Sequence, residues 1–164
     1  MQRTYRKIIR NREQRIARRL APTQFEDQPH PMFQARNIHY EMAGRTQGMN
    51  CGGLGAMHLL VQRLGLIEDL DENLKLLKVH LPYHESDHVL NIGYNILAGG
   101  ERLEDIELRR QDEVFWNGLG AERIPDPTTA GDFTRRLAEA DILALQECLN
   151  RARLKVWRVQ PEGF

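Results

Sequence analysis

Apolar residues recur at intervals of three or four along most of the chain, and this pattern limits the possible folds more than any other feature. A first apolar face, ending at Gly65, consists of Leu54, Met57, Val61 and Leu64. The same spacing predicts helices over residues 103–110 and 113–119, and a last helix from Asp141 onward. The stripe of that last helix consists of Ile142, Leu145, Leu149, Ala152 and Val156. Because only residues 37–43 have strand character, the sequence predicts an all-α fold, a small bundle of about four or five helices.

The segment after Ser86 predicts the central helix of this bundle. Ser86 is the predicted N-cap, and the Gly99-Gly100 pair ends the helix. One face consists of Val89, Ile92 and Ile96, and Leu90, Tyr94 and Leu97 lie beside it. Apolar residues on two sides predict a helix that is buried among the others.

A further helix is predicted after Pro125-Asp126-Pro127. The residue before a proline avoids the α region, so this tripeptide is expected to be extended. Thr129, with Asp132 three residues later, is typical of a helix start. The helix that follows is expected to bury Phe133 and Leu137.

The net charge of zero hides an asymmetry along the chain. Residues 1–36 carry nine Lys or Arg against three Asp or Glu, a net charge of +6, whereas the rest carries 14 against 20, or −6. Residues 3–20 predict an amphipathic basic helix, and three prolines follow it in a linker. We therefore divide the chain into a basic N-terminal arm with a proline-rich linker, residues 1–36, and a helical module, residues 37–164. Such an arm favours a polyanionic partner.

Composition excludes several classes of protein. A hydrophobic fraction of 41% is enough to bury a core, which argues against a disordered chain. The longest apolar stretch is interrupted by Asn91 and Gly93 and falls short of the roughly 20 residues of a membrane span. No apolar leader follows Met1, so no membrane partner and no secretion are expected. Cys51 and Cys148 alone do not make a disulfide framework, which predicts a cytoplasmic protein.

The segment from His84 to His88, HESDH, matches the H-E-x-x-H pattern of zinc hydrolases. That chemistry needs two histidines one helical turn apart to bind Zn²⁺, and a glutamate to take a proton from bound water. Pro82 precedes the pattern, however, and Ser86-Asp87 is a helix-start signal. His84 then lies before the helix, and the two imidazoles do not share a face. We predict a polar helix start here and no metal site in this chain.

Basic residues at two places are candidates for contacts with DNA phosphates. Those of the arm are Arg3, Arg6, Lys7, Arg10, Arg15, Arg18 and Arg19. Those of the helix after Pro127 are Thr128, Arg135 and Arg136, which resemble the phosphate contacts at the start of a helix-turn-helix. The alternatives are a solvated or partner-docking charged helix for the arm, and a helix that only packs on the core for the second group.

Long runs of the sequence resemble a known family. They are KVHLPYHESDHVLNI at residues 78–92, LEDIELRR at 103–110 and IPDPTTAGDF at 124–133. These runs closely resemble the N-terminal region of bacterial insertion-sequence transposases of the DDE group-1 type, the insertion-sequence thirteen-eighty family. The resemblance covers about residues 38–164 and does not include the arm before Ala35.

The resemblance implies the DNA-binding part of an enzyme that cuts and joins DNA at the terminal inverted repeats of its element. In such enzymes three acidic residues of an RNase H-like α/β domain hold two Mg²⁺ ions. That domain is expected beyond Phe164, because no acidic residue here matches the three. The resemblance therefore implies double-stranded DNA and a second copy of the chain as partners, and no catalytic residue in this segment.

Two other functions remain open. One is a small transcriptional regulator with a basic arm. The other is a decayed transposase remnant that dimerises with an intact relative or inhibits it.

Overall fold

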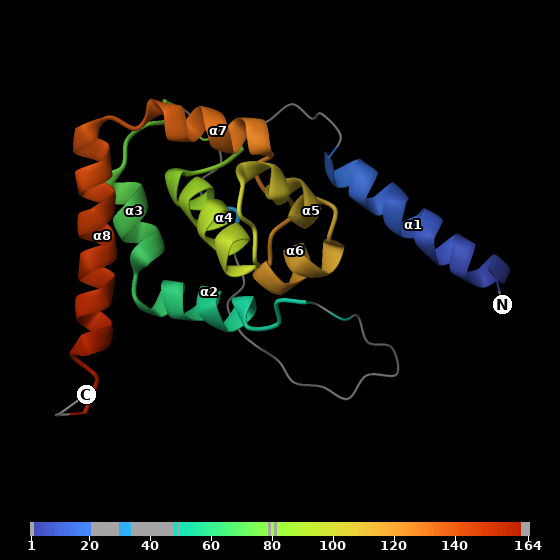
Figure 1. The fold of residues 1–164 in the computed structure, drawn as a ribbon, viewed down its shortest axis with the longest axis horizontal. Coiled ribbons are helices and arrows are strands. Elements are labelled where there is room, and N and C mark those ends of the chain that lie inside the picture. Colours follow the sequence, from blue (N-terminus) through green and yellow to red (C-terminus); the bar gives the residue numbers. More distant parts are fainter. Residues whose placement is uncertain are drawn as a thin grey trace.

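The computed structural model describes residues 2–20, 30–33, 48, 50–78, 80 and 82–161, and these form helices and no strand (Figure 1). Within this part of the chain the all-α prediction is confirmed. The elements are α1 (Gln2–Leu20), α2 (Leu54–Arg63), α3 (Leu66–Asn73), α4 (Glu85–Leu97), the 3₁₀ turn η1 (Leu103–Asp105), α5 (Ile106–Arg110), α6 (Glu113–Leu119), α7 (Pro127–Arg136) and α8 (Glu139–Trp157). The strand character predicted for residues 37–43, and most of the proline-rich linker, fall outside the described residues. Among the described helices, none is both long and apolar enough to cross a membrane.

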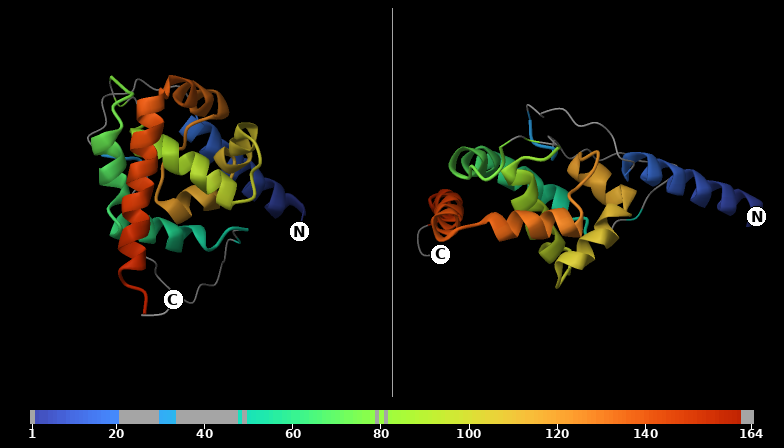
Figure 2. Two further views of the ribbon diagram at one scale, coloured as in Figure 1. Left: turned by 60° about the vertical axis from the view of Figure 1, so that its left-hand side comes forward. Right: turned by 90° about the horizontal axis from the view of Figure 1, so that it is seen from above.

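Helix α4 lies at the centre of the bundle, as the sequence predicts. Helices α3, α5 and α7 pack against it, α2 contacts α3 and α6, and α8 lies on the outer side of α3 (Figures 1 and 2). The core includes Leu70, Ile106, Trp116, Leu119 and Ile124, each at most 1% exposed.

The buried face of α4 differs from the predicted one. Leu90 and Tyr94, expected beside the apolar face, are buried, whereas Ile96 is 63% exposed. Asn91 and Asn95 are buried too, because their side-chain amides donate to the carbonyl oxygens of Pro125 (3.1 Å) and Arg102 (2.9 Å). These polar contacts set the rotation of α4, so its apolar pattern alone gives the wrong face.

Gly65 connects two helices, and the second of them is absent from the sequence prediction. The residue has a φ of 65°, a left-handed conformation that glycine adopts without steric cost. Helix α3 starts directly after it and buries Leu66, Ile67 and Leu70. A glycine expected to end α2 therefore also begins the helix on which α8 packs.

Helix α8 packs through part of the predicted stripe and through Cys148, which lies outside it. Cys148 and Ala152 are buried and Leu145 packs against the core, whereas Ile142 and Leu149 are 44% and 41% exposed. The guanidinium of Arg151 donates two hydrogen bonds, of 2.7 and 2.8 Å, to the carboxylate of Asp69 in α3. This bidentate pair turns one side of α8 toward α3 and leaves the rest of the stripe near the surface.

The last turns of α1 pack on the bundle while its first turns project from it (Figure 1). Ile16 and Leu20 lie against the core. Arg15 forms an ion pair with Glu113 at 3.1 Å, and the guanidinium of Arg19 lies 5.1 Å from the ring centroid of Trp116. The predicted basic helix is confirmed, and its C-terminal end is attached to α6.

Candidate functional site

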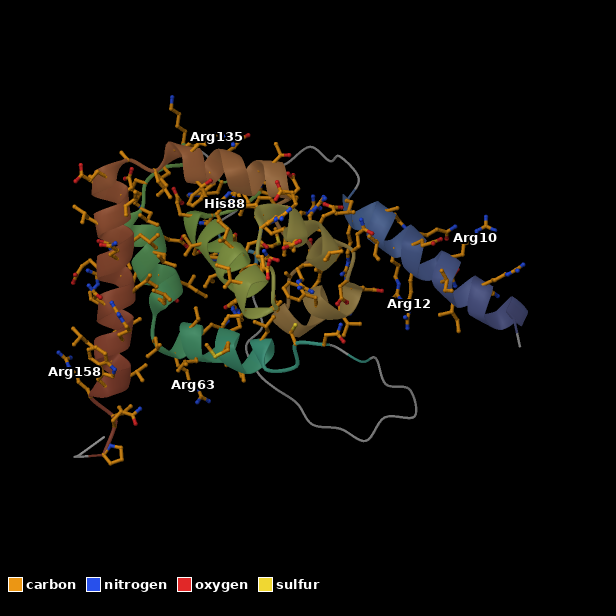
Figure 3. All side chains as sticks on the ribbon, in the orientation of Figure 1. Arg10, Arg12, Arg63, His88, Arg135 and Arg158 are labelled. Atoms are coloured by element: carbon orange, nitrogen blue, oxygen red, sulfur yellow. The ribbon has the colours of Figure 1, made fainter. Side chains whose placement is uncertain are left out.

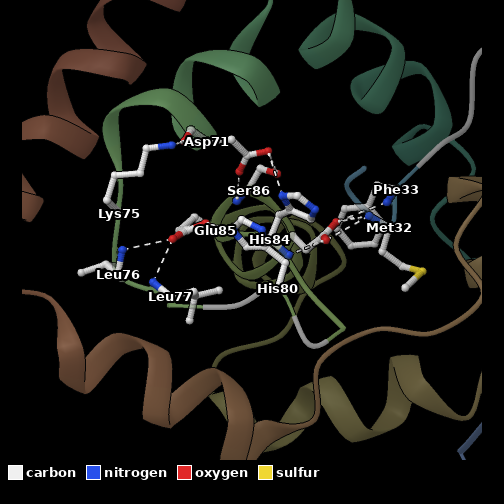
Figure 4. Close-up of polar contacts among 11 residues, drawn as sticks. Met32, Phe33, Asp71, Lys75, Leu76, Leu77, His80, His84, Glu85 and Ser86 are labelled. Carbon is white, nitrogen blue, oxygen red and sulfur yellow. Dashed lines mark hydrogen bonds and ion pairs between the residues drawn. The ribbon is translucent and has the colours of Figure 1, made fainter. Parts of the chain in front are cut away.

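The H-E-x-x-H segment forms a buried polar cluster that joins separate parts of the chain (Figure 4). We call His84, Glu85, Ser86, Asp87 and His88 the α4 polar cluster; all five residues are at most 7% exposed. Each of its three central side chains bonds to a different segment. Sequence reasoning predicts a polar helix start at this position, and the contacts below give each side chain its role.

Asp87 accepts hydrogen bonds from three backbone N–H groups. Its carboxylate receives the N–H of Met32 at 2.8 Å, of Phe33 at 3.3 Å and of His84 at 3.0 Å. Phe33 is held in the core, with its ring 5.6 Å from that of Tyr94. Burial raises the pKa of Asp87 to about 6, against the lowering effect of these hydrogen bonds. Asp87 therefore attaches Met32 and Phe33, which lie near the end of the segment assigned to the arm and linker, to the centre of the bundle.

Glu85 and Ser86 bind the chain before α4. Glu85 accepts the backbone N–H groups of Leu76 (3.0 Å) and Leu77 (2.9 Å) through Oε1. Ser86 donates its N–H and its hydroxyl to the carboxylate of Asp71 in α3, at 2.8 and 3.0 Å. These contacts satisfy buried polar groups and connect α3 to α4.

His84, and not Ser86, is the N-cap of α4. Its backbone is extended, with φ −88° and ψ 168°, and Asp87 at the third helical position bonds back to its N–H. The prediction of Ser86 as the N-cap is wrong. Asp87 accepts the N–H of His84 and so forms a capping box that starts the helix two residues before the predicted position, and the N–H of Ser86 donates to Asp71 instead. His84 therefore lies directly before the first helical residue, as expected, although the helix starts at Glu85 and not after Ser86. Among the residues that the structure describes, no group of three His, Cys, Asp or Glu side chains is placed to hold a metal ion.

His88 packs between aromatic rings. Its imidazole stacks on Phe133 of α7 with ring centroids 4.4 Å apart and an interplanar angle of 7°, and the ring of Tyr83 meets it edge-on, with centroids 5.7 Å apart. Burial lowers the pKa of His88 to about 4, so the ring is neutral at pH 7. Its Nδ1 has no hydrogen-bond partner within the described structure.

A cavity of about 480 Å³ lies beside this ring, between α7 and residues 76–78. The polar and aromatic side chains of its lining are Lys78, Tyr83, His88, Thr129, Phe133 and Arg136. Asp132 also lines it and forms an ion pair with Arg135. The cavity thus combines two cations, a neutral buried imidazole and an aromatic wall.

The arm residues fall into two groups. Arg6, Lys7, Arg10 and Arg18 are exposed, and none of them forms an ion pair with another residue that the structure describes. Arg10 and Arg12 point to opposite sides of the projecting helix (Figure 3). Arg15 and Arg19 contact α6 and hold the arm in place. Arg3 lies in α1, but its side chain is outside the described set.

Thr128, Arg135 and Arg136 lie on α7, and Arg135 is at the end of this helix that lies away from the arm (Figure 3). Thr128 and Arg135 are seven residues apart, share one face and are exposed. Arg135 pairs with Asp132, and Arg136 borders the cavity. The two neighbouring arginines, which the sequence does not distinguish, therefore have different contacts in the structure.

The start of α7 also differs from the prediction. Asp126 is the N-cap, and its carboxylate accepts the N–H and the hydroxyl of Thr129, both at 2.8 Å. Thr129 was predicted to open this helix, but a carboxylate three residues earlier is the stronger acceptor for the free N–H groups. Phe133 is buried as expected, and Leu137 is half-buried.

Comparison of the chain with protein-family models, curated proteins and solved structures found no match.

Sequence reasoning missed the cavity and the contacts of the α4 polar cluster. The signal for the cluster was present, since five consecutive polar residues lie at the start of a largely apolar helix. The cavity had no such signal, because its walls come from residues 76–78, Tyr83, α4 and α7, which only the tertiary structure brings together.

Proposed function

We propose that this chain is the DNA-binding N-terminal module of a DDE transposase, and that α1 contacts the phosphates of duplex DNA. The observation that carries the proposal is the exposure of Arg6, Lys7, Arg10, Arg12 and Arg18 on a helix that projects from the bundle. Glu13 is the only acidic residue of α1. Cations in this density neutralise phosphates and release counterions.

The attachment of α1 supports the same proposal. Residues 6 to 18 of a helix span about 18 Å, a length over which several phosphates of one duplex lie within reach. Arg15 and Arg19 bind Glu113 and Asn117 of α6, so the exposed cations are presented on a helix of fixed direction. A pre-oriented helix loses less conformational freedom on binding than a free arm does.

The transposase assignment rests on the resemblance of residues 38–164. On this proposal the DNA is the terminal inverted repeat of a mobile element, and Mg²⁺ serves only the full-length enzyme. We expect the segment to bind an end-containing duplex without nicking it, and Mg²⁺-dependent cleavage by the purified chain would overturn this part of the proposal.

Removing arginines from α1 is expected to weaken DNA binding and its salt dependence together. In the variant R6Q/R10Q/R18Q, the slope of log Kd against log salt concentration should fall by about 2.7, because each phosphate contact contributes about 0.9. Fluorescence anisotropy with a labelled duplex, measured between 50 and 200 mM salt, tests this. The matched control is R63Q/R102Q/R158Q, which removes three exposed arginines from the bundle.

The control variant R63Q/R102Q/R158Q should retain most of the slope of log Kd against log salt concentration. An equal loss in both variants would mean that binding follows net charge alone, and α1 would not be the DNA-binding helix.

A further inference from the structure

The cavity beside His88 has the dimensions of a small-molecule site. Its volume of about 480 Å³ falls within the ~300–1,000 Å³ of typical ligand pockets. Leu76, Leu77, Tyr83 and Phe133 give it an apolar wall. The exposed cations of α1 belong to a different part of the molecule, so the proposed DNA contacts do not account for this cavity.

The charges around the cavity favour an anion. Lys78 and Arg136 line it, and the only carboxylate of its lining, Asp132, is balanced by Arg135. A phosphate bound by Arg136 can receive two parallel N–H bonds from the planar guanidinium. The hydroxyl of Thr129 already donates to Asp126, so toward a ligand it can only accept a hydrogen bond, from a donor such as a sugar hydroxyl.

His88 supplies a buried polar group to the lining. The residue is only 4% exposed, and its Nδ1 has no hydrogen-bond partner in the described chain. Stacking on Phe133 fixes the plane of the ring. Buried polar atoms without a partner are rare in folded proteins, so a ligand heteroatom is the natural group to satisfy this nitrogen.

We propose that this cavity binds a nucleoside monophosphate, with the phosphate on Arg136 and Lys78 and the base near His88. The ligand chemistry, a phosphate joined to a planar hydrogen-bonding ring, has two sources. One is a free nucleotide, and the other is the 5′-phosphorylated end of a DNA strand. The proposal does not depend on DNA binding by α1.

Isothermal titration calorimetry with adenosine 5′-monophosphate tests the first source. We expect binding with a Kd below about 1 mM. R136Q should weaken it at least tenfold, and R63Q, which removes an exposed arginine of α2 that does not line the cavity, should change it less than twofold. H88F keeps an aromatic ring on Phe133 but removes the ring nitrogens, and it should also weaken binding at least tenfold.

Matched DNA duplexes with a 5′-phosphate or a 5′-hydroxyl test the second source. Tighter binding of the phosphorylated duplex that is lost in R136Q supports the proposal even without binding of the free nucleotide. If neither ligand shows an effect of R136Q, or if inorganic phosphate binds as tightly as the nucleotide, the proposal is wrong. R6Q/R10Q/R18Q should retain nucleotide binding, which separates this test from that of the proposed function.

The outward face of α8 carries a second, independent inference. Leu143, Leu154 and Trp157 are 59%, 44% and 62% exposed, and they lie opposite the side on which Cys148 and Ala152 pack against α3. Figure 2 shows α8 at the edge of the bundle. A helix face with this spacing of exposed apolar residues is typical of helix–helix association.

When two copies of this α8 face are placed antiparallel, their side chains match in charge and in apolar character. Glu147 and Arg153 each lie three residues from Asn150, and Leu143 and Trp157 each lie seven residues from it. A two-fold axis at Asn150 therefore places Glu147 opposite Arg153 of a second copy, and Leu143 opposite its Trp157. A parallel pairing would bring like charges together, which is unfavourable.

We infer that two copies of this chain pair through antiparallel α8 helices, which gives a surface to the subunit pairing that the proposed function implies. Sedimentation equilibrium should show a dimer in the wild type and at least tenfold weaker association in E147R and in R153E. Mixing these two variants restores both oppositely charged pairs, and so does the double variant E147R/R153E. Both should associate within about threefold of the wild type.

A wild-type chain that stays monomeric at 100 µM, or single variants without rescue, would overturn this inference. The variant R6Q/R10Q/R18Q should dimerise normally. Loss of DNA binding and loss of pairing are therefore measured separately.

Discussion

Replacing Asp87 with alanine is expected to lower the free energy of unfolding by about 3 kcal/mol or more, because three buried backbone N–H groups lose their acceptor at about 1 kcal/mol or more each. The carboxylate is fully buried and receives the N–H groups of Met32, Phe33 and His84. Such a loss is a large fraction of the ~5–15 kcal/mol that stabilises a domain. Urea denaturation followed by circular dichroism measures it.

Asp105 provides the matched control. Its carboxylate also accepts two backbone N–H groups, those of Glu101 at 2.8 Å and Arg102 at 3.0 Å, but at an exposed position. Water can replace the carboxylate there, so D105A should shift the urea midpoint much less than D87A. D87N, which keeps one acceptor oxygen, should lie between wild type and D87A. Equal midpoints for D87A and D105A would show that Asp87 does not hold the segment around Phe33.

Acidification is expected to destabilise the wild type more than the variant H88F. The pKa of His88 is lowered from 6.5 to about 4 by burial, so the folded protein favours the neutral ring. A group with a lowered pKa contributes its stability above the unfolded value of 6.5 and loses that stability as the pH falls through about 4. The difference of roughly 2.5 pKa units corresponds to about 3 kcal/mol.

Phenylalanine at position 88 keeps a ring against Phe133 and does not titrate. The stability of the wild type relative to H88F should therefore fall by about 3 kcal/mol between pH 7.5 and pH 3.5. Asp87, with its pKa raised to about 6, acts in the opposite direction: its contribution is present below 3.8 and is lost as the pH rises through 6. Both proteins contain Asp87, so its effect cancels in the comparison. Parallel curves of unfolding free energy against pH would contradict the burial of a neutral His88.

The local sequence predicts where most helices lie in the chain, but it does not predict which face of each helix is buried. Apolar spacing and turn residues predict α1, α2, α4, α6, α7 and α8 within a few residues, because both act over one or two helical turns. The prediction of the buried face of α4 was wrong because Asn91 and Asn95 donate hydrogen bonds to carbonyl oxygens that lie 34 and seven residues further along the chain. No local pattern contains those acceptors.

Candidate site residues divide in the same way. Exposure of the arm cations follows from a helix with too few apolar residues to be buried, so Arg6 and Arg10 could be identified from sequence. The different contacts of Arg135 and Arg136 could not be identified from sequence, because they depend on the fold: Arg135 pairs with Asp132, whereas Arg136 itself lines the cavity.

The sequence by itself determined the helical class, the concentration of positive charge at the N-terminus and the position of His84 before a helix start, because each depends on residues close together in the chain. Only the tertiary structure decided that HESDH binds three segments, that Phe33 belongs to the core and that a cavity opens beside His88. The physical reason is that a buried polar side chain must find its hydrogen-bond partner wherever the folded chain supplies one, and that place is set by packing over long sequence separations.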